Sequence, residues 1–321
     1  MEKKTLVLFG YYDPESPRFW SVRRAMQARG WNTLECRTDR PGFFAKCSEL
    51  THQWKRLRAN ADGILVMFPG HYLVPLAWLL TRSPRKILMF DAFISLYDTS
   101  VGDRKTVSRF HPKAWMLWCL DWLSCHMADE VILDTEEHRK FFMEEFHMQK
   151  ERTSVVYLEA RADIFTKRDP KAVASPLHVM FYGSYIPLQG IEHILDAAAL
   201  LEKTNTPVMF TLIGSGQTLK KMKQRAEELQ LKTVMFTPSL PLRVLAQEMA
   251  TADVCLGIFG TSGKASRVIP HKVYDAVAMG VPVITRDSPA LREKFANHPL
   301  VIPIPAGDAQ ALAEAIRFRI G

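Results

Sequence analysis

The chain has 321 residues, of which 47% are hydrophobic and 24% charged, an ordinary globular composition with enough length for two domains. Its most apolar predicted helix, 114–127, contains Asp121 and is shorter than the ~20 residues of a membrane span, and the run LVLFG near the start is too short for a signal peptide, so we expect a cytoplasmic protein without a transmembrane segment. The five cysteines form no CxxC pair, which argues against a zinc knuckle, while the net charge of +8 favours acidic partners such as phosphates or anionic lipid.

The first half of the chain alternates short apolar runs with helix-like segments. TLVLFG (5–10) is typical of a strand, and SPRFWSVRRAMQARG (16–30) is typical of a helix that stops at Gly30. The alternation continues with strands expected at 32–37, 63–68, 86–91, 130–135 and 153–158 and helices at 43–60, 73–81, 114–127 and 136–147. This pattern predicts a Rossmann-like domain, a doubly wound parallel sheet, over residues 1–165.

A stretch with little periodicity and two prolines follows at 160–176, and we assign residues 166–176 to a linker. The pattern then restarts and predicts a second Rossmann-like domain over 177–321. Its expected strands are 178–184, 208–216, 233–238, 254–259, 281–285 and 300–305, and its expected helices are 190–204, 218–231, 241–253, 271–280 and 308–320. Open α/β sheets bind ligands beyond the carboxyl ends of their strands, so two such domains facing a central cleft favour an enzyme with two substrates.

Three loops of the second domain leave the carboxyl ends of predicted strands, at 182–190, 213–217 and 260–272. Their backbone N–H groups could cradle phosphates, but the chain contains neither a Walker P-loop nor a GxGxxG fingerprint. Each loop can therefore also be interpreted as a plain turn between a strand and a helix. The glycines that would allow close approach of a ligand are Gly183, Gly190, Gly214 and Gly216.

Cations gather where the helix of residues 271–280 begins. Arg267, His271 and Lys272 lie at this helix N-terminus, and Lys264 precedes them. The N-terminus of a helix already carries partial positive charge, so cations there are locally unfavourable. A bound anion would remove that penalty, and we predict an anion site here; a solvated basic loop is the alternative.

Five stretches of the second domain carry a specific resemblance through their order and spacing. They are FYGSYIPLQGIEHILDAAALL, FTLIGSGQTLKKMKQRAEEL, VMFTPSLPLRVLAQEMATADVCLGIF, HKVYDAVAMGVPVIT and IPAGDAQALAEAI. Together they resemble the donor-binding domain of the GT-B glycosyltransferases, in particular the retaining family 4 group. The first half is similar mainly in architecture, and in ADEVILDTEEH and YLEARADIF.

The resemblance implies transfer of a sugar from a nucleotide sugar, such as a UDP- or GDP-sugar, to a hydroxyl of a glycan, a lipid-linked or a small-molecule acceptor. It also implies retention at the anomeric carbon, no metal, no cofactor, and a place in polysaccharide biosynthesis. The loops and the resemblance together assign the following residues to donor binding: Gly183, Ser184, Gln189, Gly190, Gly214, Gly216, Pro238, Lys264, His271, Lys272 and Asp275.

The chain departs from the family pattern at several charged positions. Ser184 and Gln189 stand where the family usually has the Arg and Lys that hold the donor diphosphate. Asp275 matches a glutamate that holds the ribose hydroxyls, and Arg267 matches, by spacing, the other glutamate of a pair. We hypothesise that Arg267 and Lys272 replace the missing diphosphate contacts. Two alternatives stay open: a binding or scaffold protein that has lost catalysis, and a nucleotide-sugar epimerase.

Candidates for the acceptor side follow strands of the first domain. His71 follows the strand at 63–68, and Asp91 ends the strand at 86–91, where a carboxylate can accept sugar hydroxyls or act as a base. With Arg267 they form the predicted catalytic set, although a lone histidine in a loop is more often structural. The other acceptor-side candidates are Tyr12, Asp13, Arg18, Tyr97 and Asp98.

The predicted helix at 43–58 mixes aromatic and basic side chains. Phe43, Phe44 and Trp54 alternate there with cations, so the helix could dock on the inner face of an anionic membrane. The simpler interpretation is a helix that covers one face of the sheet. Nucleic acid is not an expected partner, because no basic stripe interleaved with aromatics is evident.

Overall fold

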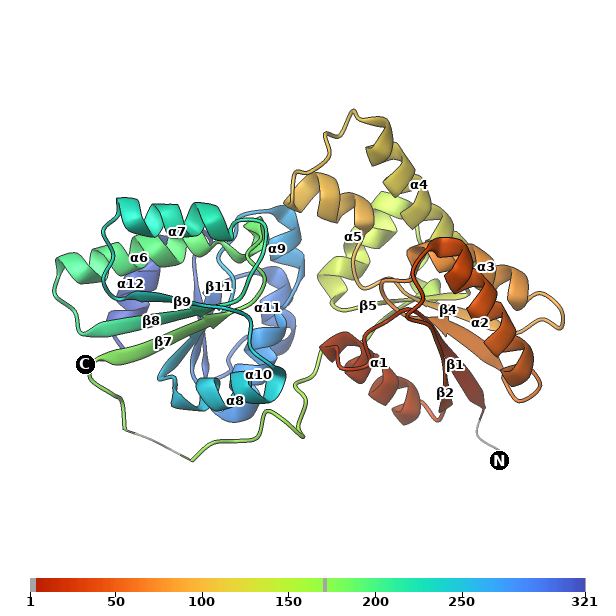
Figure 1. Cartoon of the computed structure of the whole chain (residues 1–321), viewed down its shortest axis with the longest axis horizontal. Coiled ribbons are helices and arrows are strands. Elements are labelled where there is room, and N and C mark those ends of the chain that lie inside the picture. The colour runs from red at the N-terminus through yellow and green to blue at the C-terminus, as the bar shows by residue number, and fades with distance from the viewer. Residues whose placement is uncertain (1–3, 170–171, 321) are drawn as a thin grey trace. The chain divides into compact units, whose positions relative to one another are not determined.

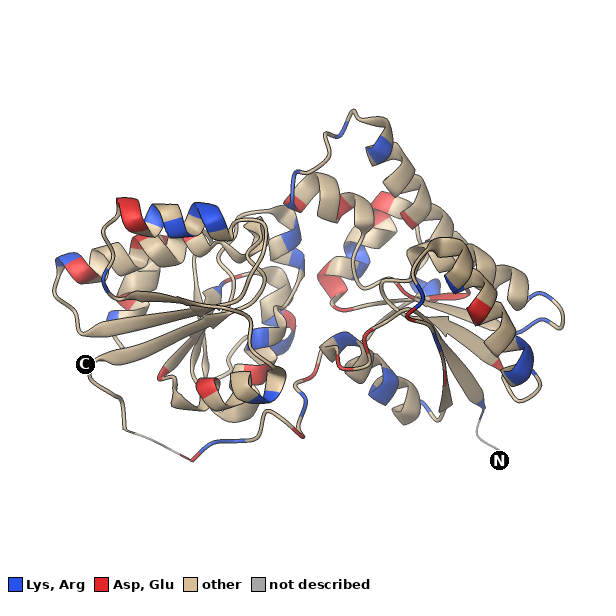
Figure 2. Cartoon of the chain, viewed as in Figure 1, with Lys and Arg blue, Asp and Glu red and all other residues tan. Residues whose placement is uncertain are grey.

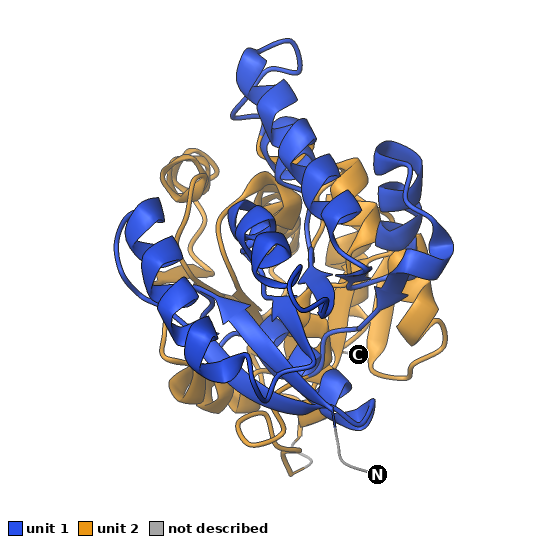
Figure 3. Ribbon diagram, turned by 90° about the vertical axis from the view of Figure 1, so that its right-hand side faces the viewer, with its two compact units in different colours: residues 1–101, 105–159 blue, residues 102–104, 160–321 orange. Residues whose placement is uncertain are grey.

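The computed structural model describes residues 4–169 and 172–320 of the chain. It divides into two compact units, Met1–Val101 with Lys105–Glu159 and Gly102–Arg104 with Ala160–Gly321 (Figure 3). The division falls after Glu159, whereas the sequence predicts a boundary between residues 165 and 177. Within the predicted linker, residues 170–171 lie outside the described part of the chain.

The first unit contains a six-stranded parallel sheet in the order β2-β1-β3-β4-β5-β6 (Figure 1). Its elements are β1 (Thr5–Gly10), α1 (Pro17–Ala28), β2 (Asn32–Arg37), α2 (Phe43–Leu57), β3 (Gly63–Val66), η1 (His71–Leu73), α3 (Val74–Leu80), β4 (Ile87–Asp91), η2 (Asp98–Asp103), α4 (Pro112–Met127), β5 (Glu130–Leu133), α5 (Glu136–Phe146), η3 (Lys150–Arg152) and β6 (Thr153–Val155).

The second unit contains a six-stranded parallel sheet in the order β12-β11-β10-β7-β8-β9. Its elements are β7 (Leu177–Tyr182), η4 (Pro187–Gln189), α6 (Ile191–Lys203), β8 (Val208–Ile213), α7 (Leu219–Glu228), β9 (Val234–Thr237), α8 (Leu242–Thr251), β10 (Val254–Leu256), α9 (Gly263–Arg267), α10 (His271–Met279), β11 (Val283–Arg286), α11 (Pro289–Phe295), β12 (Val301–Ile304) and α12 (Ala309–Arg317).

Each sheet is covered by helices, and each unit has a hydrophobic core of its own. The central strands consist of buried apolar runs, because a parallel sheet with helices on both faces exposes neither side to water. Helix starts follow local capping signals: Ser16 accepts a hydrogen bond from the Phe19 amide at the start of α1, and Ser288 accepts one from the Leu291 amide at the start of α11. The predicted fold class, two Rossmann-like doubly wound parallel sheets, is confirmed.

The elements differ from the prediction mainly at their ends, apart from the short helices α9 and α11, which were expected to be loops. The strand expected at 208–216 ends at Ile213, because Gly214 and Gly216 take φ values of +144° and +146°. The loop expected at 260–272 contains the short helix α9, whose first amides are capped by the Ser262 side chain. No helix within residues 4–169 and 172–320 is both long enough and apolar enough to cross a membrane.

Candidate functional site

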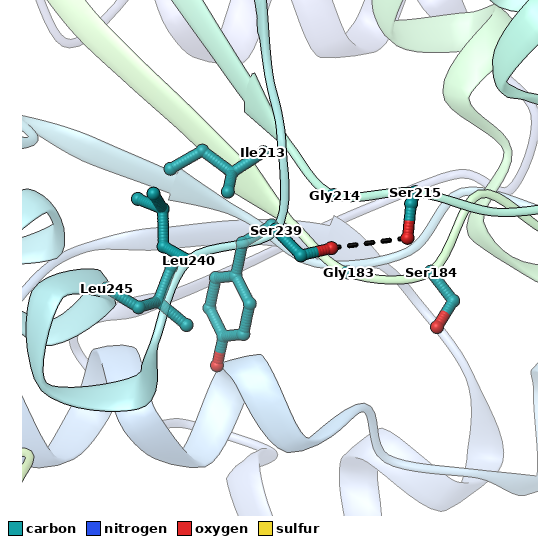
Figure 4. A pocket seen from close by; sticks show the side chains of 9 residues that line it. Gly183, Ser184, Ile213, Gly214, Ser215, Ser239, Leu240 and Leu245 are labelled. Carbon is teal, nitrogen blue, oxygen red and sulfur yellow. Dashed lines mark hydrogen bonds between the residues drawn. The ribbon is translucent and has the colours of Figure 1, made fainter.

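The carboxyl ends of β7, β8 and β9 form the wall of a pocket in the second unit. These three strands are parallel neighbours, so the loops that follow them emerge at one edge of the sheet. The pocket has a volume of about 200 Å³ (Figure 4). It is lined by Tyr182, Gly183, Ser184, Ile213, Gly214, Ser215, Ser239, Leu240 and Leu245.

Two of the predicted glycine loops come close enough to exclude side chains at their contact. A Cβ atom at Gly214 would lie 2.0 Å from the Gly183 carbonyl oxygen, and one at Gly216 would lie 2.7 Å from the Tyr185 amide nitrogen. Glycine is therefore required where the loop after β8 crosses the loop after β7. The crossing leaves backbone groups of both loops at the pocket wall, which is the arrangement that phosphate-binding loops use.

Hydroxyl groups supply the side-chain polarity of this wall. The Ser215 and Ser239 hydroxyl oxygens lie 3.2 Å apart, and Ser184 on the neighbouring loop is exposed (Figure 4). The predicted donor residue Pro238 directly precedes Ser239 and is also exposed. The nine lining residues include no lysine or arginine, so any cation for an anionic ligand has to come from beside the pocket.

Lys272 provides such a cation against the first glycine loop. Its amine Nζ donates a hydrogen bond of 2.6 Å to Gln189 Oε1 and lies 3.7 Å from the centre of the Phe181 ring. A Cβ atom at Gly183 would lie 3.0 Å from the same Nζ. The structure thus brings together Gly183, Gln189 and Lys272, three of the predicted donor residues. Burial lowers the pKa of Lys272 well below its usual range.

Asp275 lies one helical turn further along α10, buried behind the pocket wall. Its Oδ2 accepts a hydrogen bond from the Tyr182 hydroxyl, and His271 Nδ1 lies 3.0 Å from the same oxygen. Burial raises the pKa of Asp275 to about 8, and burial, helped by the neighbouring Lys272, lowers the pKa of His271 to about 3. Near neutral pH His271 is therefore uncharged and contributes no positive charge at the start of α10.

Asp275 Oδ1 and His271 Nε2 are buried atoms that have no hydrogen-bond partner within the described part of the chain. Buried polar atoms are nearly always paired, so such atoms usually indicate a bound water, a ligand or a functional role. Tyr182 lines the pocket and binds Asp275, and so it connects this cluster to the pocket wall.

The remaining predicted donor residues lie around the third loop. Gly190 has φ +63°, and a Cβ atom there would lie 2.4 Å from the Gly260 amide nitrogen, so the first and third loops pack against each other. Lys264 is buried on α9, and Arg267 is half-buried at the end of that helix. Neither Lys264 nor Arg267 is part of the pocket lining.

In the first unit, Asp91 is fully buried and bound by Arg18. The Arg18 Nε and Nη2 atoms donate to Asp91 Oδ1 at 2.8 and 2.6 Å, and Arg18 Nη1 donates to the Val156 carbonyl at 2.6 Å. Burial raises the pKa of Asp91 and Arg18 opposes that rise. This pair connects α1, β4 and the residue after β6, and we interpret Asp91 as part of the framework of the unit and not as a base.

His71 is also buried, in the helical turn after β3. Its Nε2 lies 3.0 Å from the Ile94 carbonyl oxygen and 3.6 Å from Asp121 Oδ1, and burial lowers its pKa to about 4. Asp121 accepts hydrogen bonds from Ser95 Oγ and from the amides of Leu96 and Tyr97. These contacts hold the loop after β4 in place.

The other acceptor-side candidates divide between core and surface. Tyr12 is buried, stacks on Phe19 and donates from its hydroxyl to the Leu8 carbonyl. Asp13 is exposed, and its carboxylate accepts from the Glu15 amide. The Asp98 amide donates to Ser95 Oγ within the loop that Asp121 holds.

Several residues of these sites were not predicted from the sequence. Tyr182 and Ser239 lie within the stretches that resemble the glycosyltransferases. Their spacing along the chain gave no sign that Tyr182 contacts Asp275 or that Ser239 contacts Ser215. Asp121 offered a signal, because it is a single carboxylate inside an otherwise apolar helix. The part of the chain that the structure describes contains no group of three or more His, Cys, Asp or Glu side chains placed to hold a metal ion.

Comparison with known proteins adds independent findings. The family model described as "Glycosyl transferases group 1" matches residues 163–320. The chain is 27% identical over 152 residues to the putative colanic acid biosynthesis glycosyltransferase WcaL of Salmonella typhimurium, an alignment that covers 46% of this chain and 37% of that protein. It is 31% identical over 148 residues to the probable glycosyltransferase WbjE of Pseudomonas aeruginosa, covering 42% and 34%. The matches thus span less than half the length of these relatives.

Similar solved structures cover nearly the whole chain. HepE from Anabaena, solved in complex with UDP and glucose, has a TM-score of 0.69 at 16% identity, with 99% of this chain and 90% of that chain covered. Sucrose-phosphate synthase from Thermosynechococcus elongatus has a TM-score of 0.73 at 15% identity, with the same coverage. At this level of identity the likeness concerns the fold.

Proposed function

We propose that this chain, whose residues 163–320 belong to the family of glycosyl transferases group 1, transfers a sugar from a nucleotide-diphosphate sugar to a hydroxyl of an acceptor. The observation that carries the proposal is the pocket at the ends of β7, β8 and β9, with the Lys272 amine against Gly183 beside it. Backbone N–H groups in the pocket wall can bind an anion, and the Lys272 cation lies next to them. This combination suits a diphosphate.

In the proposed reaction, the bond between the anomeric carbon and the diphosphate oxygen breaks, and a bond from that carbon to the acceptor oxygen forms. The nucleoside diphosphate leaves with the bonding electrons, and the acceptor hydroxyl loses its proton. Negative charge therefore grows on the diphosphate, and N–H groups that already point toward it lower the activation barrier. The amides of Gly183 and Gly214 donate to the carbonyls of Ile213 and Thr237, so amides further along the loops after β7 and β8 would serve this purpose.

Lys272 is suited to respond to such a charge. In the empty protein its ammonium is poorly solvated, which is why burial lowers its pKa. A diphosphate beside Gly183 would favour the charged form and would give that ammonium a partner in addition to Gln189. Lys272 thereby replaces the Arg and Lys that the family usually has at the positions of Ser184 and Gln189, where they hold the donor diphosphate. Arg267 is not among the residues that line the pocket, so the proposal for the diphosphate contacts rests on Lys272.

Asp275 remains our candidate for recognition of the donor nucleoside. Its carboxyl is buried, and the Tyr182 hydroxyl that it binds belongs to a residue of the pocket lining. We propose that Asp275 acts together with Tyr182, so that removing either group weakens donor binding. Loss of one hydrogen bond of this kind corresponds to about 0.5–1.5 kcal/mol.

Similar proteins suggest which nucleotide sugar and which acceptor to test first. HepE was solved with UDP and with UDP-glucose, so UDP-sugars are the first donors to test. Two of the relatives are named for the biosynthesis of colanic acid and amylovoran, which favours a growing glycan as the acceptor. Retention at the anomeric carbon and independence of metal and cofactor are part of the proposal.

The test is a panel of UDP-, GDP- and ADP-sugars in a thermal-shift assay, followed by turnover with the donors that bind. A donor at 100 times its Kd should stabilise the protein by about 2.7 kcal/mol. Release of nucleoside diphosphate that persists in EDTA supports transfer without a metal. A product with the same anomeric configuration as the donor, seen by NMR, supports retention. Binding without turnover in the presence of acceptor extracts would favour the scaffold alternative, and interconversion of donor epimers would favour the epimerase.

A variant that fills the pocket provides the specificity control. Ser184 is exposed at the pocket wall, so Ser184→Trp should block the donor without disturbing the core. Gln224→Trp places the same side chain at an exposed position of α7 outside the pocket. Donor stabilisation should disappear in the first variant and persist in the second. Equal donor binding by both would locate the donor site elsewhere.

A further inference from the structure

Large apolar side chains are exposed around the start of α4. Phe110 is 84% exposed, Trp115 66% and Met116 53%, and Trp122 and Leu123 continue the exposed face one to two turns later. The buried residues of α4 lie on its other side, at Ala114, Leu117, Asp121, Ser124 and Cys125. An outer helix face is normally polar, and a contiguous exposed apolar face indicates an interaction surface.

The charges on the same segment have one sign. Residues 104–120 contain Arg104, Lys105, Arg109 and Lys113 and neither Asp nor Glu. Figure 2 shows Lys and Arg, without acidic residues, along the loop before α4 and at the start of the helix. Lys105, Arg109 and Lys113 are all exposed, so their charges are available to a partner.

The surface is also hollowed between the loop and the helix. A pocket of about 380 Å³ is lined by Tyr97, Arg109, Phe110, Trp115, Trp118 and Glu145. Trp118 Nε1 donates to Glu145 Oε1 at 2.8 Å, so the only acidic group in the lining already has a partner within the unit. The pocket therefore offers aromatic walls with the Arg109 guanidinium beside the Phe110 ring, 5.5 Å from its centre.

We propose that this surface, Lys105, Arg109, Phe110, Lys113, Trp115 and Met116, docks the first unit on an anionic lipid bilayer. Aromatic and methionine side chains can enter the boundary between headgroups and acyl chains, while adjacent cations contact anionic headgroups. In Figure 1 the loop and the first turns of α4 (gold) extend beyond the sheet of their unit, which leaves these side chains accessible.

The alternative membrane surface expected from the sequence, α2, fits less well. Its Trp54 is 2% exposed and packs with Leu50 into the core, so most of this helix covers the sheet. Of its apolar residues, Phe43 and Phe44 at the first turn are exposed.

A second copy of the chain is also a poorer occupant of the α4 surface. A two-fold contact would bring Lys105, Arg109 and Lys113 of both copies to one interface, where like charges repel. An anionic bilayer complements both the apolar and the charged part of the surface.

The experiment is co-sedimentation of the full chain with vesicles of phosphatidylcholine alone or mixed with phosphatidylglycerol. We expect binding to the anionic vesicles at low salt and partial release at high salt, because screening weakens contacts with the surface charge but leaves the apolar contacts. Arg109→Gln with Lys113→Gln should weaken this binding about 25-fold, at about fivefold for each cation removed. Phe110→Ser with Trp115→Ser should abolish the part of the binding that survives at high salt.

The matched controls remove equally exposed aromatic side chains from other parts of the surface. Phe318→Ser and Phe44→Ser remove side chains that are 83% and 85% exposed, and both variants should bind as the unchanged protein does. Circular dichroism and Tm confirm that each variant is folded. Equal sedimentation with neutral vesicles, no sedimentation, or loss of binding in Phe44→Ser would overturn the proposal. Sedimentation velocity tests for a dimer. A concentration-dependent dimer that Phe110→Ser with Trp115→Ser abolishes, while vesicle binding persists, would also overturn the proposal.

Discussion

At the scale of single residues, the buried charge of Lys272 destabilises the empty protein and is available to a bound donor diphosphate. Its ammonium is buried between Gln189 and the Phe181 ring, and its pKa is lowered by burial. A base whose pKa is lower in the folded state binds fewer protons there than in the unfolded chain. Its charge therefore opposes folding at low pH, and this penalty disappears as the pH rises toward 10.5.

We predict that Lys272→Met weakens donor binding and leaves the empty protein at least as stable. Loss of a hydrogen bond to a charged diphosphate corresponds to about 1.5–3 kcal/mol, or a fall in affinity of about 10- to 150-fold. Calorimetric donor titration and urea unfolding measure the two quantities. Lys203→Met, at an exposed position, is the control and should change neither. A less stable Lys272→Met protein with unchanged donor affinity would show that this lysine serves the fold alone.

Asp275 leads to a prediction for pH dependence. Its pKa is raised from 3.8 to about 8, so the folded state holds a proton that the unfolded chain has released, and stability falls as the pH rises through this range. The pKa of His271, lowered from 6.5 to about 3, has the opposite effect below pH 6.5. Of these two residues, only Asp275 therefore changes the free energy of unfolding between pH 6.5 and 8.

We expect Asp275→Asn to reduce the loss of stability between pH 6.5 and 8 by up to about 2 kcal/mol, because the asparagine amide does not titrate. Urea unfolding of both proteins at the two pH values measures the difference. Since other groups titrate equally in the two proteins, their contributions cancel. Parallel pH profiles would mean that the carboxyl of Asp275 is already ionised at pH 6.5.

At the scale of elements, the crossing of the loops after β7 and β8 depends on glycine. Gly214 has φ +144°, and its added Cβ would lie 2.0 Å from the Gly183 carbonyl oxygen. Gly42 also has positive φ, +83°, but nothing lies within 4 Å of its added Cβ. Gly42→Ala therefore tests the backbone conformation alone, whereas Gly214→Ala adds a backbone clash.

We predict a loss of about 1 kcal/mol for Gly42→Ala and at least twice that loss for Gly214→Ala, because the loops would have to separate. Urea unfolding measures both values. The separation should also weaken donor binding in Gly214→Ala but not in Gly42→Ala. Equal destabilisation of the two variants would show that the close approach of the loops is not maintained in solution.

The elements themselves were largely predictable, because most strands are short apolar runs and the long helices have a buried stripe. The short helices α9 and α11 were not predicted, since neither is long enough to show an apolar period, and the Ser262 and Ser288 caps are the local signals for their starts. The site was predictable as a set of loops but not as a set of contacts. Lys272 meets Gln189 across 83 residues and Arg18 meets Asp91 across 73, and no local pattern encodes such distances.

Contacts across the chain also changed the interpretation of individual residues. Asp91 stood at a strand exit, where an exposed carboxylate can act as a base, but Arg18 occupies that carboxylate within the core. Trp54 fitted an amphipathic membrane helix, but the sheet covers it. In both cases the residue type and position were compatible with two roles, and burial, which depends on the whole fold, separated them.

At the scale of the whole molecule, the chain consists of two units with separate sheets and separate cores. The second unit contains all of β7 to β12 and the hydrophobic cluster around Phe181, Phe210 and Ile284. Its pocket and the Lys272 and Asp275 contacts also lie within residues 160–321. A domain of this size buries enough surface to fold alone.

We therefore predict that a fragment of residues 160–321 folds cooperatively and binds the nucleoside diphosphate of the donor within about tenfold of the affinity of the full chain, which is about 1.4 kcal/mol. It should not transfer sugar, because the predicted acceptor residues belong to the first unit. Urea unfolding, calorimetry with UDP and a transfer assay measure the three properties. Lys272→Met in the fragment should weaken binding by the same factor as in the full chain, since the contact lies within one unit. A folded fragment without measurable affinity would mean that the first unit completes the donor site, whereas an unfolded fragment would mean that the two cores depend on each other.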